Sequence, residues 1–125
     1  MTALSDTLLQ AWENHDGPII LTTVDSEGTP NAIYATCVGH FGNDKLVVAD
    51  NYFNKTRANL LNHTKGSILF MTKEGKAYQI KGTMSYHTEG AIFDDMKSWN
   101  PETHPGHAAA VLAVEEAYSG GEKLL

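Results

Sequence analysis

The chain has 125 residues, of which 42% are hydrophobic and 19% charged, as is ordinary for a globular protein. This length predicts one domain, residues 1–125, built around a single hydrophobic core. Fifteen acidic and nine basic residues give a net charge of -6. Such a charge repels the phosphates of nucleic acid and anionic lipid surfaces, so we expect neither as a partner.

The cysteine content and the length of the apolar runs indicate in which cellular compartment the protein is expected. Cys37 is the only cysteine, which excludes an intramolecular disulfide. The first residues lack the basic and apolar regions of a secretory leader. Polar residues interrupt every apolar run before it reaches the roughly 20 residues of a membrane-spanning helix. We therefore expect a cytoplasmic protein with no membrane segment.

The first half of the chain predicts a helix and three strands. Apolar residues recur at helical spacing from Leu4 to Trp12, and Ser5 can cap this helix. β-Branched residues bounded by turn residues predict strands over 19–24, 31–38 and 46–49. Cys37 falls inside the second strand, where we expect a buried thiol that acts as a small hydrophobic group rather than a nucleophile.

The second half predicts two more helices and three more strands. Asn54 and Thr88 stand where helix caps belong. The helices follow over 55–62 and 92–99, and the strands over 67–71, 78–86 and 108–114. Alanine content alone favours a helix for the last of these. The Pro-Gly loop before it and the Gly-Gly pair after it favour a strand, and so does the family resemblance described next. Six short strands with three short helices predict a mainly β (α+β) barrel.

Several segments, taken in order, carry a family resemblance. They are Gly28-Thr29-Pro30-Asn31, residues 45–50, Lys55-Thr56 with Asn59-Leu60, residues 78–82, and Tyr86 with Glu89-Gly90 and Phe93. This pattern resembles the pyridoxamine 5'-phosphate oxidase-like FMN-binding proteins, and within them the small stand-alone FMN-binding proteins of anaerobic bacteria. The resemblance spans nearly the whole chain. It implies a six-stranded antiparallel split β-barrel with Greek-key topology, and a homodimer with FMN at the subunit interface.

The resemblance also implies that Lys55 and Thr56 hold the FMN phosphate. A lysine charge, a hydroxyl and the backbone N–H groups of a helix start all suit a doubly charged anion. Arg57, the only arginine, lies in the same cluster, although it can equally point to solvent. The alternative is that Lys55 and Arg57 simply solubilise an exposed helix.

For the flavin ring, the resemblance points to two short segments. They supply Tyr34, Ala35 and Thr36 on the second strand, and Asp50, Asn51 and Tyr52 after the third. An apolar slot with a few hydrogen-bonding groups is what a flavin ring requires. The alternative for Tyr34 is an ordinary strand aromatic. The resemblance further implies that residues 104–108 and the C-terminal Leu124-Leu125 close the pocket from the second subunit.

The chain departs from the family pattern in ways that narrow its function. Pro105-Gly106-His107 stands where small relatives often carry a tryptophan. A single arginine cannot grip a cofactor phosphate and a phosphorylated substrate together, which argues against oxidation of pyridoxamine phosphate. Six histidines without further cysteines do not predict a metal site.

We therefore expect an FMN-binding flavoprotein, either a flavin-dependent oxidoreductase or an electron-transfer protein. Its partner would be a small-molecule substrate or a redox partner protein. The alternative is a non-catalytic binding or storage protein that holds FMN or haem on the same barrel. In the haem case, His40 or His107 would be the candidate axial ligand.

Overall fold

Residues 3–125 are described by the computed structural model, and within them the chain forms three helices and eight strands. The helices are α1 (Asp6–Glu13), α2 (Lys55–Leu61) and α3 (Ala91–Trp99). The strands are β1 (Ile19–Val24), β2 (Pro30–Ala35), β3 (Val38–Phe41), β4 (Lys45–Asp50), β5 (Lys65–Met71), β6 (Ala77–His87), β7 (Ala108–Ser119) and β8 (Glu122–Lys123).

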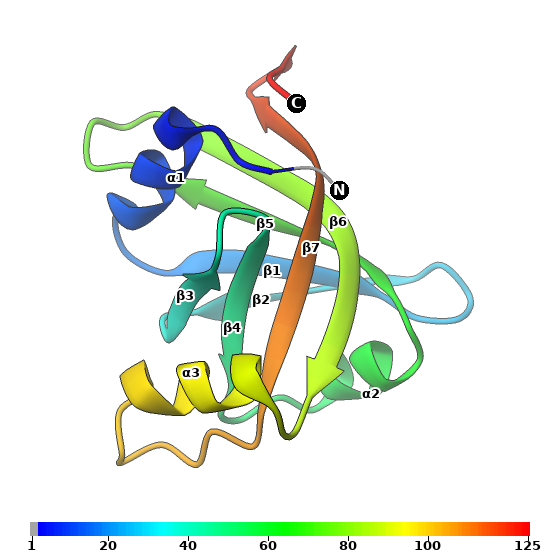
Figure 1. Cartoon of the computed structure of the whole chain (residues 1–125). Coiled ribbons are helices and arrows are strands. Elements are labelled where there is room, and N and C mark those ends of the chain that lie inside the picture. Colours follow the sequence, from blue (N-terminus) through cyan, green and yellow to red (C-terminus); the bar gives the residue numbers. More distant parts are fainter. Residues whose placement is uncertain (1–2) are drawn as a thin grey trace.

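All strand pairs are antiparallel, and the strands form one sheet in the order β2-β1-β5-β6-β7-β4-β3, with β8 paired to β7. Strands β5, β6, β7 and β4 lie in the spatial order of a Greek key. The two edge strands, β2 and β3, are joined by Thr36 and Cys37 alone. Because two residues span only a few ångströms, the sheet must curl until its edges meet. Figure 1 shows β1, β2 and β5 running across β4 and β7, with the long strand β6 bending between the two sets.

The prediction of six strands is wrong, and the strand count differs at two places. The predicted strand 31–38 is divided at Thr36, because residues up to Ala35 pair with β1 whereas Val38 and its successors pair with β4. Both pieces continue one β-type run, so local pattern cannot separate them. At the other place, Gly120 has a φ of +57° and turns the tail back onto β7 as β8.

The starts of α1 and α2 agree with the sequence, whereas the start of α3 differs. The Ser5 side chain accepts a hydrogen bond from the Leu8 N–H, as a cap should. Asn54 occupies the cap position of α2, but its side chain makes no capping hydrogen bond. The prediction of Thr88 as the cap of α3 is wrong, because α3 begins after Gly90, whose φ of +95° suits glycine.

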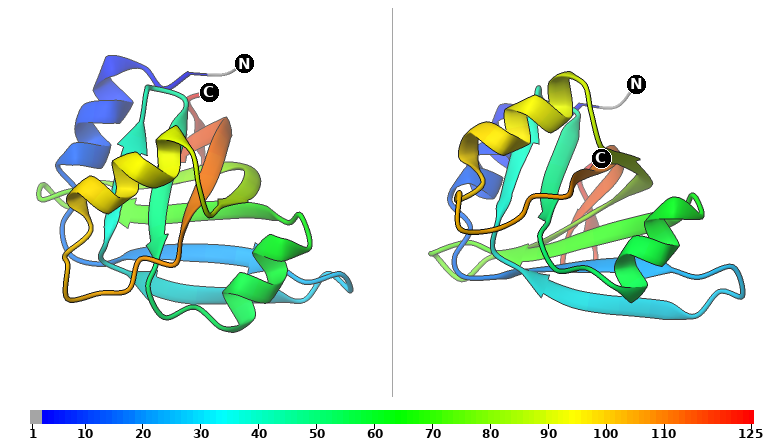
Figure 2. Two further views of the ribbon diagram at one scale, coloured as in Figure 1. Left: turned by 60° about the horizontal axis from the view of Figure 1, so that its bottom comes forward. Right: turned by 90° about the horizontal axis from the view of Figure 1, so that it is seen from below.

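Alternate residues of β4 and β7 face two separate hydrophobic clusters. Leu46 and Leu112 point into the curl, where α1 closes the cluster with Trp12, whose indole N–H donates to the Gly39 carbonyl at 3.1 Å. Val47 and Val111 point outward, under α3. Figure 2 shows α3 lying along this outer side and α2 near the opposite end of the same rim. The alanine-rich strand β7 therefore lies between two layers, where small side chains permit close packing.

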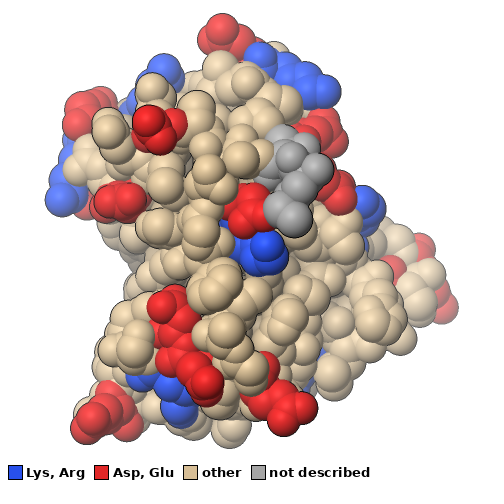
Figure 3. Space-filling model, viewed as in Figure 1, with Lys and Arg blue, Asp and Glu red and all other residues tan. Residues whose placement is uncertain are grey.

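The surface carries its charges without a basic patch on the face shown in Figure 3, where Lys and Arg are scattered and carboxylates lie over α3. Among the described residues, no helix has the length and apolar character needed to cross a membrane.

Gly82→Ala is expected to destabilise the fold, because the new Cβ would overlap the backbone carbonyl of Ala113 at the β6 bulge. Overpacking typically costs about 1 to 3 kcal/mol, and we expect the upper end because the obstacle is backbone. Urea unfolding followed by tryptophan fluorescence measures the loss. Gly121→Ala is the control, since its Cβ meets no atom within 4 Å. Equal stability of both variants would contradict this packing of β6 against β7.

Candidate functional site

A cavity of about 340 Å³ opens where the two sheet edges meet, a size within the range of small-molecule sites, about 300 to 1,000 Å³. Its walls come from β2, the β2–β3 connection, the end of β4, the segment leading into α2, and the loop after α3. The lining residues are Asn31, Ile33, Tyr34, Ala35, Thr36, Cys37, Ala49, Asn51, Tyr52, Phe53, Asn54, Lys55, Thr56 and His104.

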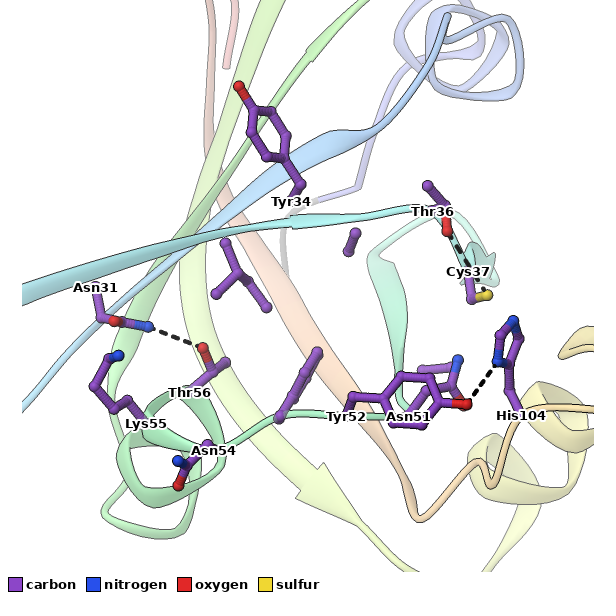
Figure 4. A pocket seen from close by; sticks show the side chains of 14 residues that line it. Asn31, Tyr34, Thr36, Cys37, Asn51, Tyr52, Asn54, Lys55, Thr56 and His104 are labelled. Atoms are coloured by element: carbon purple, nitrogen blue, oxygen red, sulfur yellow. Dashed lines mark hydrogen bonds between the residues drawn. The ribbon is translucent and has the colours of Figure 1, made fainter.

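Strand alternation decides which β2 side chains face this cavity. Ile33 and Ala35 are half-buried and pack against the inner core, so they form its apolar wall. Tyr34 lies between them and is 76% exposed. Figure 4 shows its ring pointing away from the other lining residues. Tyr34 therefore lines the cavity with its backbone, and its ring belongs to the outer face of the sheet.

One end of the cavity carries a cation and a buried hydroxyl. Asn31 Nδ2 donates to Thr56 Oγ1 at 3.0 Å, which leaves the Thr56 hydroxyl hydrogen available for a further acceptor. Lys55 is exposed beside them and forms no ion pair with any residue from 3 to 125. Figure 4 shows the three residues together at this end. The arrangement suits an anion.

The opposite end of the cavity is polar and, among residues 3–125, has no Lys, Arg, Asp or Glu side chain in its lining. The Tyr52 hydroxyl lies 3.0 Å from His104 Nδ1, and the two rings meet edge to face with centroids 5.6 Å apart. Figure 4 places Thr36 and Cys37 beside this pair. The prediction that Cys37 is buried within a strand is wrong, because it lies half-buried between β2 and β3 and lines the cavity.

Asp50 lies behind the cavity wall rather than in it. Its side chain is fully buried and accepts hydrogen bonds from Arg57 Nε at 2.7 Å, from the Tyr86 hydroxyl at 2.5 Å and from the Phe53 N–H at 3.0 Å. Burial alone would raise the pKa of Asp50, but the bonds from Arg57, Tyr86 and Phe53 outweigh it, so the pKa lies below its ordinary value. Burial and the bond to Asp50 raise the pKa of Tyr86 to about 12.

Arg57 is thereby directed away from the Lys55 end of the cavity. Its guanidinium contacts both Asp50 oxygens, with Nη2 donating to Oδ1 at 2.9 Å. It therefore neither adds a second cation beside Lys55 nor points freely to solvent. Sequence spacing places Arg57 next to Thr56 but gives no sign of this partner, because Asp50 lies on the preceding strand.

The structure brings together seven of the eight residues expected at the site and leaves Asp50 out. The seven are Tyr34, Ala35, Thr36, Asn51, Tyr52, Lys55 and Thr56. His104 lines the cavity of its own chain, whereas the resemblance implied that its loop reaches across from a partner. Sequence reasoning missed Asn31 and Ile33, which period-two alternation on β2 could have found. Among residues 3–125, no three His, Cys, Asp or Glu side chains gather as a metal site.

Comparison with known proteins gives one family match and several structural ones. Residues 6–119 match the family described as Pyridoxamine 5'-phosphate oxidase. An uncharacterized protein of Methanocaldococcus jannaschii is 27% identical over 122 residues, which cover 93% of this chain and 80% of that protein. HupZ of Group A Streptococcus has a TM-score of 0.80 at 23% identity, covering 93% of each chain. An FMN-binding protein of Syntrophomonas wolfei has a TM-score of 0.76 at 21% identity, covering 90% of this chain and 86% of that one.

Asp50→Asn is expected to lower the free energy of unfolding by about 1.5 to 3 kcal/mol at about pH 7, the usual worth of hydrogen bonds to a charged group. Ionised Asp50 stabilises the fold above its ordinary pKa of 3.8, and this contribution is lost as the pH falls through the lower folded-state pKa. The difference in the free energy of unfolding between the unchanged chain and Asp50→Asn should therefore shrink in acid. Urea unfolding at several pH values measures it.

Asp16→Asn is the matched control, since Asp16 is exposed. Its stability should follow that of the unchanged chain. A gap for Asp50→Asn that stays constant down to about pH 2 would contradict the role of the carboxylate charge.

Proposed function

The chain belongs to the pyridoxamine 5'-phosphate oxidase family, and on that premise we propose that it binds FMN in the cavity beside Lys55 and Thr56. The observation that carries the proposal is the Lys55 ammonium, which has no ion-pair partner among residues 3–125 and lies next to the Thr56 hydroxyl at one end of a cavity with an apolar wall. In a chain with a net charge of -6, a cation left without a carboxylate partner inside a cavity suits an anionic ligand.

The lining fits the three chemical parts of FMN. Lys55, Thr56 and Asn31 suit the phosphate, through charge and hydroxyl donors. Ile33, Ala35, Ala49 and Phe53 offer an apolar wall for the flat ring system. Polar groups at the far end suit the polar edge of the ring, with backbone groups of Tyr34 and Thr36 as further candidates. The solved FMN-binding protein of Syntrophomonas wolfei shares this fold, which supports the proposal.

Bound FMN would supply electron-transfer chemistry, while the protein supplies binding, orientation and electrostatics. We propose a redox role, as an oxidoreductase acting on a small molecule or as an electron carrier for a partner protein. Pyridoxamine phosphate is a poor candidate substrate. The one arginine is engaged by Asp50 and cannot grip a second phosphate. Turnover with a nicotinamide cofactor as reductant would separate this role from non-catalytic FMN storage.

We also propose that the protein is a homodimer with FMN near the subunit interface. Tyr34, Ile20 and Leu69 are cross-strand neighbours on the outer face of the sheet, and Tyr34 and Leu69 are 76% and 40% exposed. A row of apolar side chains on an open face suits burial against a second copy. Tyr52, at the cavity mouth, is 71% exposed and would be covered by the same association.

Lys55→Ala and Thr56→Val should each weaken FMN binding about tenfold or more, because one charge-assisted hydrogen bond contributes about 1.5 to 3 kcal/mol. Quenching of flavin fluorescence on titration with protein measures the dissociation constant. Riboflavin lacks the phosphate, so its affinity should not change in Lys55→Ala. Lys73→Ala, in the exposed turn between β5 and β6, is the protein control. An unchanged FMN affinity in Lys55→Ala would refute the phosphate site.

Tyr34→Ser is expected to shift the dimer toward monomer and to weaken FMN binding in parallel. Light scattering after size exclusion, over a range of protein concentrations, measures the shift. Ala32→Ser changes an exposed neighbour on the same face of β2 by one small group and should leave the mass unchanged. A monomeric mass for the unchanged chain at all concentrations would contradict the dimer.

A further inference from the structure

The Tyr52–His104 pair lies at the end of the cavity opposite Lys55 and is held there by buried contacts. Asn51, which precedes Tyr52, exchanges two amide hydrogen bonds with Asn100 at 2.9 and 3.1 Å. Asn51 Oδ1 also accepts a bond from the Gly106 N–H at 2.9 Å. The segment that carries Tyr52 is therefore fastened to the segment that carries His104 at two positions, Asn100 and Gly106, which lie before and after His104. These bonds fix the backbone on either side of His104, while the Tyr52 ring itself is 71% exposed.

His104 is the only imidazole among the residues that line this cavity. Histidine is the side-chain type whose charge changes near neutral pH. The bond to Tyr52 uses Nδ1, and Nε2 has no hydrogen-bond partner among residues 3–125. Figure 4 shows the second ring nitrogen turned away from Tyr52, toward the side lined by Cys37. His104 therefore lines the cavity with Nε2 able to bind a proton, while its Nδ1 is hydrogen-bonded to Tyr52.

The other ionisable groups near His104 are Lys97, Cys37, Glu102 and Lys55, and each has a different position or contact. Lys97 of α3 donates to the Pro105 carbonyl at 3.0 Å and so supports the loop. The Cys37 thiol lies 4.0 Å from Thr36 Oγ1. Glu102 is exposed in the same loop, and Lys55 lies at the far end of the cavity. Among these groups, His104 alone combines a place in the lining with an imidazole ring that a neighbouring hydroxyl holds.

We propose that His104, held by Tyr52, binds the proton that balances the charge of the reduced cofactor. This inference rests on the proposed binding of FMN. When a reductant such as dithionite transfers two electrons to bound FMN together with one proton from water, the cavity gains one negative charge. Neutral His104 then takes a second proton from water at Nε2 and becomes imidazolium, while Nδ1–H donates to the Tyr52 oxygen. Two electrons and two protons have entered, and the net charge is unchanged.

The physical reason is mutual stabilisation of opposite charges. A negative charge a few ångströms from an imidazole favours its protonated form and so raises its pKa, and the imidazolium in turn stabilises the reduced cofactor. Tyr52 acts as a positioning residue, because its hydroxyl fixes the ring orientation. A merely structural pair would hold the loop equally well in both redox states and would show no change of proton affinity.

The experiment is an NMR titration of the histidine ring protons in the FMN-loaded protein, oxidised and then reduced with dithionite. His104→Gln assigns the His104 resonance. We expect the proton affinity of His104 to rise about tenfold or more on reduction, and that rise to be smaller in Tyr52→Phe. His107, exposed in the same loop and absent from the cavity lining, is the internal control and should not shift.

Potentiometric titration of bound FMN over a pH series gives an independent readout. Where His104 is neutral in the oxidised protein and protonated in the reduced one, the unchanged chain should take up one more proton per two electrons than His104→Gln. His107→Gln should behave like the unchanged chain. If FMN binds but His104 has the same proton affinity in both redox states, this inference is wrong and the proposed function stands. If FMN does not bind, both are wrong.

Discussion

The buried carboxylate of Asp50 is the interaction on which the cavity depends. It ends β4 and is contacted by Arg57 of α2, Tyr86 of β6 and the backbone N–H of Phe53. Its own carbonyl accepts a bond from the His107 N–H. A desolvated charge is tolerable only when it is paired and hydrogen-bonded, so the three groups that contact the carboxylate are held at fixed positions. The segment from Asn51 to Asn54 starts next to Asp50, and the loop after α3 is bonded to the Asp50 carbonyl through His107.

Because Asp50 pairs with Arg57, the two cationic side chains at the start of α2 have different environments. Arg57, with its planar fork of donors, satisfies the buried carboxylate, a task that a lysine point charge would perform less well. Lys55, two residues earlier, remains without a carboxylate partner among the described residues. The cavity therefore carries one cation at one end, which matches a single phosphate group better than a pyrophosphate. The other parts of a ligand would contact the apolar wall and the polar end that carries Tyr52 and His104.

The curl of the sheet places these groups together. β2 and β3 are opposite edges of one sheet, joined through Thr36 and Cys37, and the cavity lies at that joint. β2 contributes its inward-facing residues, β4 contributes Ala49, and the loop after α3 contributes His104. A site at the meeting of two edges can use backbone groups from strands that are far apart in the sheet order. Successive side chains of β2 point to opposite faces of the sheet, so the Tyr34 ring lies on the outer face and not in the cavity.

The sequence by itself determined the elements whose signals are local. Apolar spacing and Ser5 define α1, and turn residues bound β1, β4, β5 and β6. The Lys55-Thr56 pair predicts an anion-binding end of the site. Seven of the eight residues that the family resemblance implies for the site line the cavity, and they come from three short segments. Only the tertiary structure decided where the run after Pro30 breaks, that Asp50 turns inward to Arg57, and that His104 meets Tyr52. These outcomes depend on contacts between residues 7 to 52 positions apart. Propensity and periodicity describe neighbours along the chain, whereas burial and pairing are set by neighbours in space.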